Sequence, residues 1–359
     1  MKSPAPKPGV LEIAAYIGAR AGAPARAYQL ASNESAIGPS AAAMEAHRAA
    51  AAALDLYPDG SAEVLRQAIG EIHSLDAPRI VCGNGSDELL GLIGHAYLRP
   101  GDEVLFSAHA FLVYRTIALA NSASAVAAPE PDLRVDLERM LATLTPRTRV
   151  VFIANPNNPT GTYISGEALR HLHAGIPPDV LLVIDSAYAE YLHSTDYESG
   201  AELVKKFDNV VMTRTFSKAY GLAGLRVGWA FCPPAVADVL NRVRGPFNVS
   251  VTAQHAATAA LRDQAHLRRA VAHTDTWRRW LAREITALGL RVDESAGNFV
   301  LIQFPNAETA KAADRFLIER GIILRPTTAY GLPHCLRMTV GLEEANRAAV
   351  AALRAFMQA

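Results

Sequence analysis

A lysine in the segment TRTFSKAYGLAGLRVG (residues 213–228) is the first candidate for chemistry. Lys218 follows a short apolar run and stands among small and apolar residues, where burying an ammonium group without a partner is costly. A buried lysine tends to have a lowered pKa, which suits a nucleophile that forms a Schiff base. Arg226, eight residues later, offers a fork of donors suited to phosphate, and Thr215 and Ser217 add hydroxyl groups. Taken alone, the segment would more often be a loop with a surface lysine.

An aspartate ends the apolar run VLLVID (residues 180–185). Asp185 therefore stands at the carboxyl end of a predicted strand, where a buried carboxylate requires a cationic partner. A pyridinium nitrogen is one such partner, because pyridoxal-phosphate sites place an Asp against the ring nitrogen. In general, an Asp at this place in a chain more often caps the helix that follows.

Two further segments combine turn residues with polar side chains. In IANPNNPTGTY (residues 153–163), two Asn-Pro steps and a Thr-Gly step indicate a turn, and the Asn158 amide can donate to a phenolate oxygen. In CGNGSDELL (residues 82–90), Gly85 and Ser86 precede a predicted helix, whose N-terminus attracts phosphate. The second segment lacks the third glycine of a dinucleotide fingerprint, so alone it is weak evidence for phosphate binding.

The apolar runs that precede these polar residues indicate a parallel sheet. They are short and separated by helical stretches, as in a sheet that is buried on both faces. The predicted strands are residues 103–107, 149–154, 180–185, 210–213 and 226–231. A doubly wound α/β domain follows, and such domains bind ligands at the carboxyl ends of their strands. That edge holds the residues just after each run, among them Asp185 and Lys218.

The C-terminal part of the chain has a different pattern. A helical stretch rich in alanine and arginine covers residues 252–288, and two possible strands at residues 299–304 and 336–340 flank a helical stretch at residues 307–320. This pattern predicts a smaller α/β domain of residues 251–359 after a large domain of residues 31–250. We expect residues 1–30 to pack with the smaller domain.

The composition argues against several classes of function. The 359 residues carry 35 Lys and Arg against 35 Asp and Glu, so no net field attracts nucleic acid or an anionic membrane. Three widely spaced cysteines fit a reducing compartment, and His171 and His173 lack companion ligands at metal spacing, so no metal is expected. With no secretory signal and no apolar run of membrane-spanning length, we expect a cytoplasmic protein.

Together, these segments resemble one family, the fold-type I, class I/II aminotransferases that depend on pyridoxal 5'-phosphate. Within it the chain is most similar to histidinol-phosphate aminotransferases, from KPGVLEIAAY near the start to LRMTVGLEEANRAAVAAL near the end. The specific signature is NPNNPTG, then IDSAY, then TFSKAYGLAGLR. The resemblance implies a large domain with a mainly parallel, seven-stranded type of sheet between helices, and a smaller α/β C-terminal domain. It also implies a homodimer with shared active sites.

The resemblance implies a role for each residue around the cofactor. Lys218 holds the cofactor as a Schiff base, and Asp185 pairs with the pyridine nitrogen. Asn158 and Tyr188 bond the phenolate oxygen, and Phe111, which would otherwise be an ordinary core residue, stacks on the ring. The residues that surround the phosphate are Gly85, Ser86, Asp87, Ser217 and Arg226, with Thr215 a further member and Tyr57 contributed by the neighbouring subunit.

Four residues match family positions that grip the substrate: Tyr16, Asn33, Arg325 and Arg337. Of these, Arg337 is the expected clamp for a carboxylate or phosphate, because a guanidinium pairs with two oxygens at once.

The chain departs from the family pattern at three places. It reads NESAIGPS (residues 33–40) where NENPxGPS is usual, and Ser186 stands where DEAY has its glutamate. Arg115 stands where a proline is common. None of these changes removes a catalytic group, but the first and third could reshape the substrate pocket.

The expected reaction is transamination between L-histidinol phosphate and 2-oxoglutarate, a step of histidine biosynthesis, by a ping-pong mechanism. One alternative is an aromatic amino-acid aminotransferase acting on phenylalanine or tyrosine. A second is a pyridoxal-phosphate-dependent decarboxylase of a phosphorylated amino acid. A non-enzymatic transcription regulator is disfavoured, because about thirty residues precede LASNES and the net charge is zero.

Overall fold

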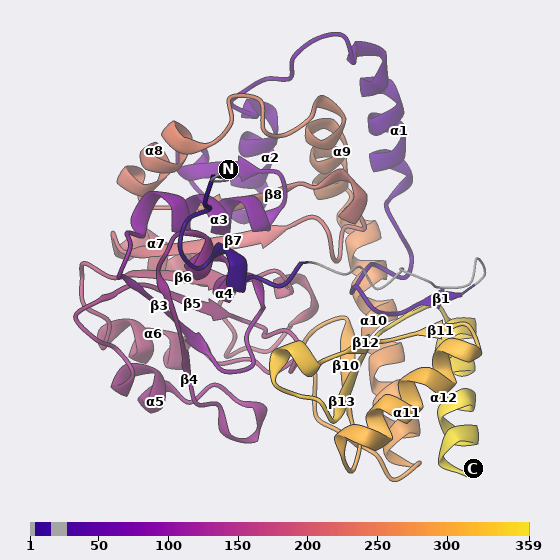
Figure 1. Cartoon of the computed structure of the whole chain (residues 1–359). Coiled ribbons are helices and arrows are strands. Elements are labelled where there is room, and N and C mark those ends of the chain that lie inside the picture. Colours follow the sequence, from indigo (N-terminus) through magenta and orange to yellow (C-terminus); the bar gives the residue numbers. More distant parts are fainter. Residues whose placement is uncertain (1–3, 16–26, 359) are drawn as a thin grey trace.

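The computed structural model describes residues 4–15 and 27–358. Its main feature is a seven-stranded sheet with the strand order β2-β8-β7-β6-β5-β3-β4 (Figure 1). The strands are β2 (Ile80–Gly83), β3 (Glu103–Ser107), β4 (Ser124–Ala128), β5 (Thr148–Ala154), β6 (Leu181–Asp185), β7 (Val210–Thr215) and β8 (Gly228–Phe231). The run from β4 to β7 is parallel, and β8 is antiparallel to both β7 and β2. The predicted mainly parallel sheet is therefore confirmed.

The sheet is buried on both faces, which explains why its strands are apolar without interruption. Along β6, Leu182 and Ile184 belong to one core cluster, whereas Leu181 and Val183 belong to another. Successive side chains of a strand point to opposite faces, so each face of β6 packs against its own layer of helices.

The sequence prediction missed two strands of this sheet, β2 and β4. The strand β4 reads SAVAA, and its small residues have low strand propensity and are partly exposed at the edge of the sheet. The strand β2 has four residues only, which gives little room for a periodic signal. The predicted run at residues 226–231 begins two residues later, at Gly228.

Helices cover the two faces of the sheet. One core cluster holds buried residues of α3 (Ser86–Tyr97), α4 (Val113–Ala120) and α8 (Pro234–Val243). The other holds buried residues of α1 (Ala41–Ala50), α2 (Glu63–His73), α5 (Leu137–Ala142), α6 (Gly166–Ala174), α7 (Ala201–Lys206) and α9 (Val251–Arg262). Short 3-10 turns occur at Val10–Glu12, Ala51–Ala53, Ala77–Arg79, Pro131–Leu133, Ala189–Tyr191, Ala223–Leu225 and Thr328–Tyr330.

The C-terminal part forms a four-stranded antiparallel sheet of order β12-β13-β10-β9, which lies with its helices at the lower right of Figure 1. Its elements are β9 (Arg291–Val292), β10 (Phe299–Gln303), β12 (Arg325–Pro326), β13 (Cys335–Thr339), α10 (Gln264–Thr286), α11 (Ala307–Glu319) and α12 (Glu343–Met357). The helical stretch predicted at residues 252–288 is two helices, because Asp263 interrupts it. The Asp263 carboxylate accepts the His266 backbone amide at 2.9 Å and so caps α10.

The N-terminal part contacts both regions. The strand β1 (Tyr28–Gln29) pairs in parallel with β11 (Ile322–Ile323) beside the C-terminal sheet. Farther upstream, the Ser122 hydroxyl donates to the Pro8 carbonyl at 3.1 Å, next to the end of α4. Residues near Pro8 therefore lie against the seven-stranded sheet's helices, whereas Tyr28 and Gln29 extend the C-terminal region.

Candidate active site

A cavity of about 1240 Å³ opens at the carboxyl ends of the parallel strands and reaches the C-terminal sheet. Asp185 ends β6 and Thr215 ends β7, and both line this cavity, as the topology of a doubly wound sheet requires. The predicted site residues that line it are Asn33, Ser86, Asp87, Phe111, Asn158, Asp185, Tyr188, Thr215, Ser217, Lys218, Arg226, Arg325 and Arg337. Side chains that are far apart in the sequence therefore line the same cavity.

Two predicted residues of the described part of the chain are not among those that line the cavity. Gly85 comes directly before α3. Tyr57 is 82% exposed, with its ring stacked on Phe247 at a centroid distance of 4.5 Å. Tyr16 falls outside the described residues.

Lys218 is the candidate nucleophile of the cavity. Its Nζ donates to the Ser32 carbonyl at 3.1 Å. Burial lowers the pKa of Lys218 to about 8, and the positive charge of nearby Arg337 acts in the same direction. A substantial share of the amine is therefore neutral slightly above pH 7, which a nucleophile or proton acceptor requires.

Asp185 is the candidate partner for a basic ring nitrogen. It is 5% exposed, and burial raises its pKa to about 6 in the absence of a cationic partner. Two hydroxyl groups oppose this rise, because they donate to the ionised carboxylate: Tyr114 at 3.0 Å and Thr213 at 3.3 Å. A cation placed against this carboxylate would restore the charged form.

The sequence prediction missed both Tyr114 and Thr213. For Thr213 a signal exists, because it lies two residues before Thr215 and so on the same face of β7, in register with Asp185. For Tyr114 the only signal is that a tyrosine in an apolar stretch needs a partner for its hydroxyl group. The sequence alone does not show that this partner is 71 residues away.

We expect Tyr114→Phe to lower kcat by about three- to tenfold, because one hydrogen bond to the Asp185 carboxylate is lost. The pKa of Asp185 rises in this variant, so the acid limb of the kcat profile moves to higher pH. The matched control is Tyr163→Phe, which removes a similar bond from a tyrosine to Asp196 at the surface. An unshifted acid limb would contradict the role given to Tyr114.

An anion cradle lies at the N-terminus of α3. Arg226 donates to the Ser217 hydroxyl at 3.1 Å and to the Asp87 carboxylate at 3.3 Å, beside the free backbone amides at the start of this twelve-residue helix. Gly85 has a φ of 84°, and a Cβ there would lie 2.4 Å from an Arg226 nitrogen. The close approach of backbone and guanidinium thus depends on glycine, and these donors fit the phosphate of the predicted cofactor.

Two arginines of the C-terminal sheet lie side by side and line the cavity. Arg325 on β12 and Arg337 on β13 are directly paired in antiparallel register, so their side chains share a face of the C-terminal sheet. Like charges in such a pair are unfavourable by themselves, which makes this place suited to an anionic ligand. Arg337 is 5% exposed and donates to Asn158 and, at 2.6 Å, to the Ala31 carbonyl. Its Nε has no partner in the described part of the chain.

Asn33 and Tyr188 join the two halves of the site. The Asn33 side-chain amide donates to the Tyr188 hydroxyl at 2.8 Å, and the Asn33 backbone amide donates to Thr339 of β13 at 2.9 Å. Tyr188 therefore lies between the segment after β6 and the C-terminal sheet. Across residues 4–15 and 27–358, no group of three or more His, Cys, Asp or Glu side chains is placed to hold a metal ion.

A lysine of lowered pKa, a buried carboxylate and a separate anion cradle in one cavity define an enzyme built for a phosphorylated, ring-bearing cofactor. The chain belongs to the family of class I and II aminotransferases, whose model matches residues 26–353. It is therefore an aminotransferase, as the sequence predicts.

Individual relatives share the whole length of the chain. A histidinol-phosphate aminotransferase of Rhodopseudomonas palustris is 51% identical over 99% of both chains. The crystal structure of a histidinol-phosphate aminotransferase from Sinorhizobium meliloti in complex with pyridoxal-5'-phosphate has a TM-score of 0.92 at 29% identity, covering 97% of this chain and 96% of that one. An aspartate aminotransferase of Thermus thermophilus has a TM-score of 0.82 at 25% identity, with coverages of 94% and 93%. The predicted fold is confirmed.

Proposed function

We propose that the protein is a pyridoxal-phosphate-dependent aminotransferase that transfers the amino group of L-histidinol phosphate to 2-oxoglutarate, giving imidazole acetol phosphate and L-glutamate. The observation that carries this proposal is the full-length similarity to proteins of that name, at 51% identity. The paired Arg325 and Arg337 support it, because both substrates are anions and would occupy the same cationic wall in turn. The step belongs to histidine biosynthesis.

Different residues of the cavity would bind different parts of the cofactor. Pyridoxal phosphate, when bound, supplies an aldehyde that takes the amino group and a ring that withdraws electrons from the α-carbon. Lys218 would be the attachment point, and Asp185 would pair with the ring nitrogen. Asn158 and Tyr188 would donate to the ring oxygen, and Phe111 would cover one face of the ring. The residues that would hold the phosphate are Gly85, Ser86, Asp87, Thr215, Ser217 and Arg226.

Lys218 also moves the proton. With a pKa lowered to about 8, its Nζ is neutral often enough near pH 8 to accept the proton that leaves the substrate's α-carbon. The same Nζ then returns the proton as the amino group is transferred. Asn33 positions Tyr188 through the bond of 2.8 Å, and Arg337 holds the anionic end of the substrate.

The test compares kcat/KM for L-histidinol phosphate and for phenylalanine, each with 2-oxoglutarate as acceptor. We expect L-histidinol phosphate to be preferred by at least about a hundredfold, because phenylalanine has no phosphate to pair with the cationic wall of Arg325 and Arg337. A preference for phenylalanine or tyrosine would assign the aromatic alternative. Release of carbon dioxide in place of a keto product would assign the decarboxylase.

We propose further that two copies of the chain form a homodimer with shared active sites. An apolar patch on the surface includes Leu54, Leu56, Tyr57, Val64 and Phe247, which are all exposed. Large exposed apolar side chains that gather on a surface are typical of an interface, and two of these, Tyr57 and Phe247, are in direct contact. A second copy that covers it would receive the hydroxyl group of Tyr57 at its own phosphate site.

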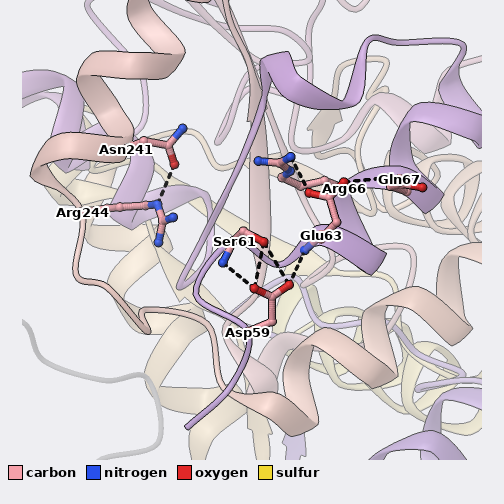
Figure 2. A network of polar contacts seen from close by, with 7 residues as sticks. All are labelled: Asp59, Ser61, Glu63, Arg66, Gln67, Asn241 and Arg244. Carbon is pink, nitrogen blue, oxygen red and sulfur yellow. Dashed lines mark hydrogen bonds and ion pairs between the residues drawn. The ribbon is translucent and has the colours of Figure 1, made fainter.

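The turn that follows Tyr57 is held by hydrogen bonds to the Asp59 carboxylate (Figure 2). The Asp59 carboxylate accepts the backbone amides of Ser61 at 2.8 Å and Glu63 at 2.7 Å, and these bonds lower the pKa of Asp59. A Cβ at Gly60 would lie 2.5 Å from the Pro246 carbonyl, so the turn and the neighbouring loop are in close contact. This contact keeps the ring of Tyr57 stacked on Phe247 and presents its hydroxyl group to a partner.

Tyr57→Phe is expected to weaken cofactor binding by about tenfold, because a hydrogen bond to a charged phosphate is lost while the stacking on Phe247 is kept. When this variant is mixed and refolded with Lys218→Ala, hybrid dimers contain one site with both Lys218 and Tyr57. About a quarter of all sites should then regain the wild-type cofactor affinity. If every site that keeps Lys218 also kept the weakened cofactor affinity, shared active sites would be excluded. A monomer in light scattering would exclude them as well.

For the organisation of the chain, we propose a large cofactor-binding unit of residues 31–250 and a smaller unit of residues 251–359, with the cavity between them. We also propose a cytoplasmic location, in keeping with a biosynthetic role. None of the helices in the described ranges is long and apolar enough to span a membrane.

A further inference from the structure

We propose that Arg115 on α4 is an additional substrate-recognition residue, which binds the negatively charged group at the far end of the substrate. This inference rests on the proposed function. In the sequence, Arg115 is notable only because the family usually has a proline at this position. The cofactor and substrate contacts described above do not include it.

Arg115 lies on the face of α4 that lines the cavity. Leu112, Thr116 and Leu119 line it as well, at the spacing of three or four residues that places side chains on one side of a helix. The N-terminal segment also lines this end of the cavity, with the apolar Ile13 and its neighbours and with one carboxylate, that of Glu12. A guanidinium group on this wall is a local feature that a charged ligand can recognise.

The guanidinium of Arg115 is available for a ligand, unlike others in the cavity. Arg226 is held by Asp87, and Arg337 by Asn158. Arg115 is exposed to the cavity, and its side chain makes no hydrogen bond or ion pair within the described part of the chain. A ligand that binds it therefore displaces water rather than a protein partner.

The position of Arg115 relative to Phe111 fixes which part of a substrate it can meet. The helical turn begins at Phe111, whose carbonyl accepts the Tyr114 amide at 3.1 Å, and Arg115 follows Phe111 by four residues. Side chains at this spacing start about 6 Å apart. If Phe111 covers the reacting ring, the long side chain of Arg115 reaches the solvent side of that ring, where the far end of a substrate extends.

The ligand chemistry is an oxyanion, which two substrates of the proposed reaction carry. For 2-oxoglutarate this group is the distal carboxylate, when Arg337 holds the carboxylate beside the keto group. For the amino donor it is the phosphate, when that group lies at Arg115 in place of Arg337. Because Arg115 is exposed, water and salt screen its attraction, so the expected gain is about fivefold in kcat/KM and arises mainly in KM. A neutral aromatic substrate gains nothing from this residue.

The experiment measures the two half-reactions separately with Arg115→Gln, Arg115→Lys and the control Arg315→Gln. Arg315 is also exposed, but it lies on α11 of the C-terminal region, outside the cavity lining. The donor arm compares L-histidinol phosphate with L-histidinol, and the acceptor arm compares 2-oxoglutarate with pyruvate. Within each pair, one member carries the distal anion and the other lacks it together with the atoms that attach it. The ratio of kcat/KM between the two members therefore reports the contact of the anion with Arg115.

Arg115→Gln is expected to lower kcat/KM about fivefold for the anionic member of a pair and less than about twofold for its neutral-tailed counterpart, with the loss vanishing at about 1 M salt. Arg115→Lys should retain most of the wild-type ratio. A selective loss in the donor arm assigns the phosphate, and one in the acceptor arm assigns the carboxylate. Equal losses within both pairs, or none, would overturn the proposal. If the wild-type protein failed to convert L-histidinol phosphate, the proposed function would fail, while the acceptor arm would still test Arg115.

Discussion

Lys218→Ala is expected to lower kcat by about 10⁴-fold or more while leaving the fold intact. Loss of a positioned general acid–base alone costs up to about 10⁴-fold, and this lysine is also the attachment point for the cofactor. Among residues 4–15 and 27–358 its side chain makes a single hydrogen bond, to the Ser32 carbonyl, so the surrounding structure loses little support. The measurement is a steady-state rate at saturating cofactor, together with circular dichroism to confirm folding.

The matched control is Lys205→Ala, which removes an exposed lysine of α7 that pairs with Glu202 at 2.7 Å. This variant should turn over at the wild-type rate, because exposed ion pairs contribute little and Lys205 lies outside the cavity. Methylamine added to Lys218→Ala offers a second check, since an external amine can accept the proton. Turnover of Lys218→Ala at the normal rate would remove the lysine from the chemistry.

Asp185→Asn is expected to lower kcat by about 10²- to 10³-fold. A buried ion pair that loses one partner costs several kcal/mol, and an amide cannot hold a proton on the ring nitrogen as a carboxylate does. The change keeps the shape of the side chain and leaves an oxygen that can accept from Tyr114. The measured quantities are kcat and the affinity for pyridoxal phosphate, both of which should fall.

The same variant should have the opposite effect on the cofactor-free protein. Burial raises the pKa of Asp185 from 3.8 to about 6, so the ionised carboxylate is disfavoured in the folded state. The unfolding free energy that this group contributes is therefore complete below about pH 4 and is lost as the pH rises through 6, by roughly 3 kcal/mol. Without cofactor, Asp185→Asn should be more stable than the wild type at pH 7. The quantity to measure is the difference in unfolding free energy between Asp185→Asn and the wild type. The same difference at pH 4 and at pH 7 would show that burial does not raise the pKa of Asp185.

Much of the site was predictable because its residues follow apolar strands. The run ending at Asp185 and the run before Lys218 are both strands of a parallel sheet, and their carboxyl ends meet at one edge. Gly85 was predictable for another reason, because a glycine before a helix lets the backbone approach a phosphate at the helix N-terminus. Its positive φ and its closeness to Arg226 are known only from the structure.

Contacts between distant elements were beyond the sequence pattern. The bond from Tyr114 to Asp185 joins the start of α4 to the end of β6, and no local periodicity encodes the distance between them. The pairing of Arg325 with Arg337 depends on the register of two strands, one of which has only two residues. The edge strand β4 was missed for a related reason, since its small residues carry little of the apolar signal that marks a buried strand.

Transamination of L-histidinol phosphate can be tested in a single-turnover experiment on the purified protein with bound pyridoxal phosphate. L-histidinol phosphate is added without any keto acid, and the absorbance of the lysine-bound cofactor is followed. We expect rapid and complete loss of this absorbance with one equivalent of imidazole acetol phosphate formed, much faster than with phenylalanine. An unchanged spectrum with L-histidinol phosphate, beside rapid conversion by phenylalanine, would contradict the proposed function.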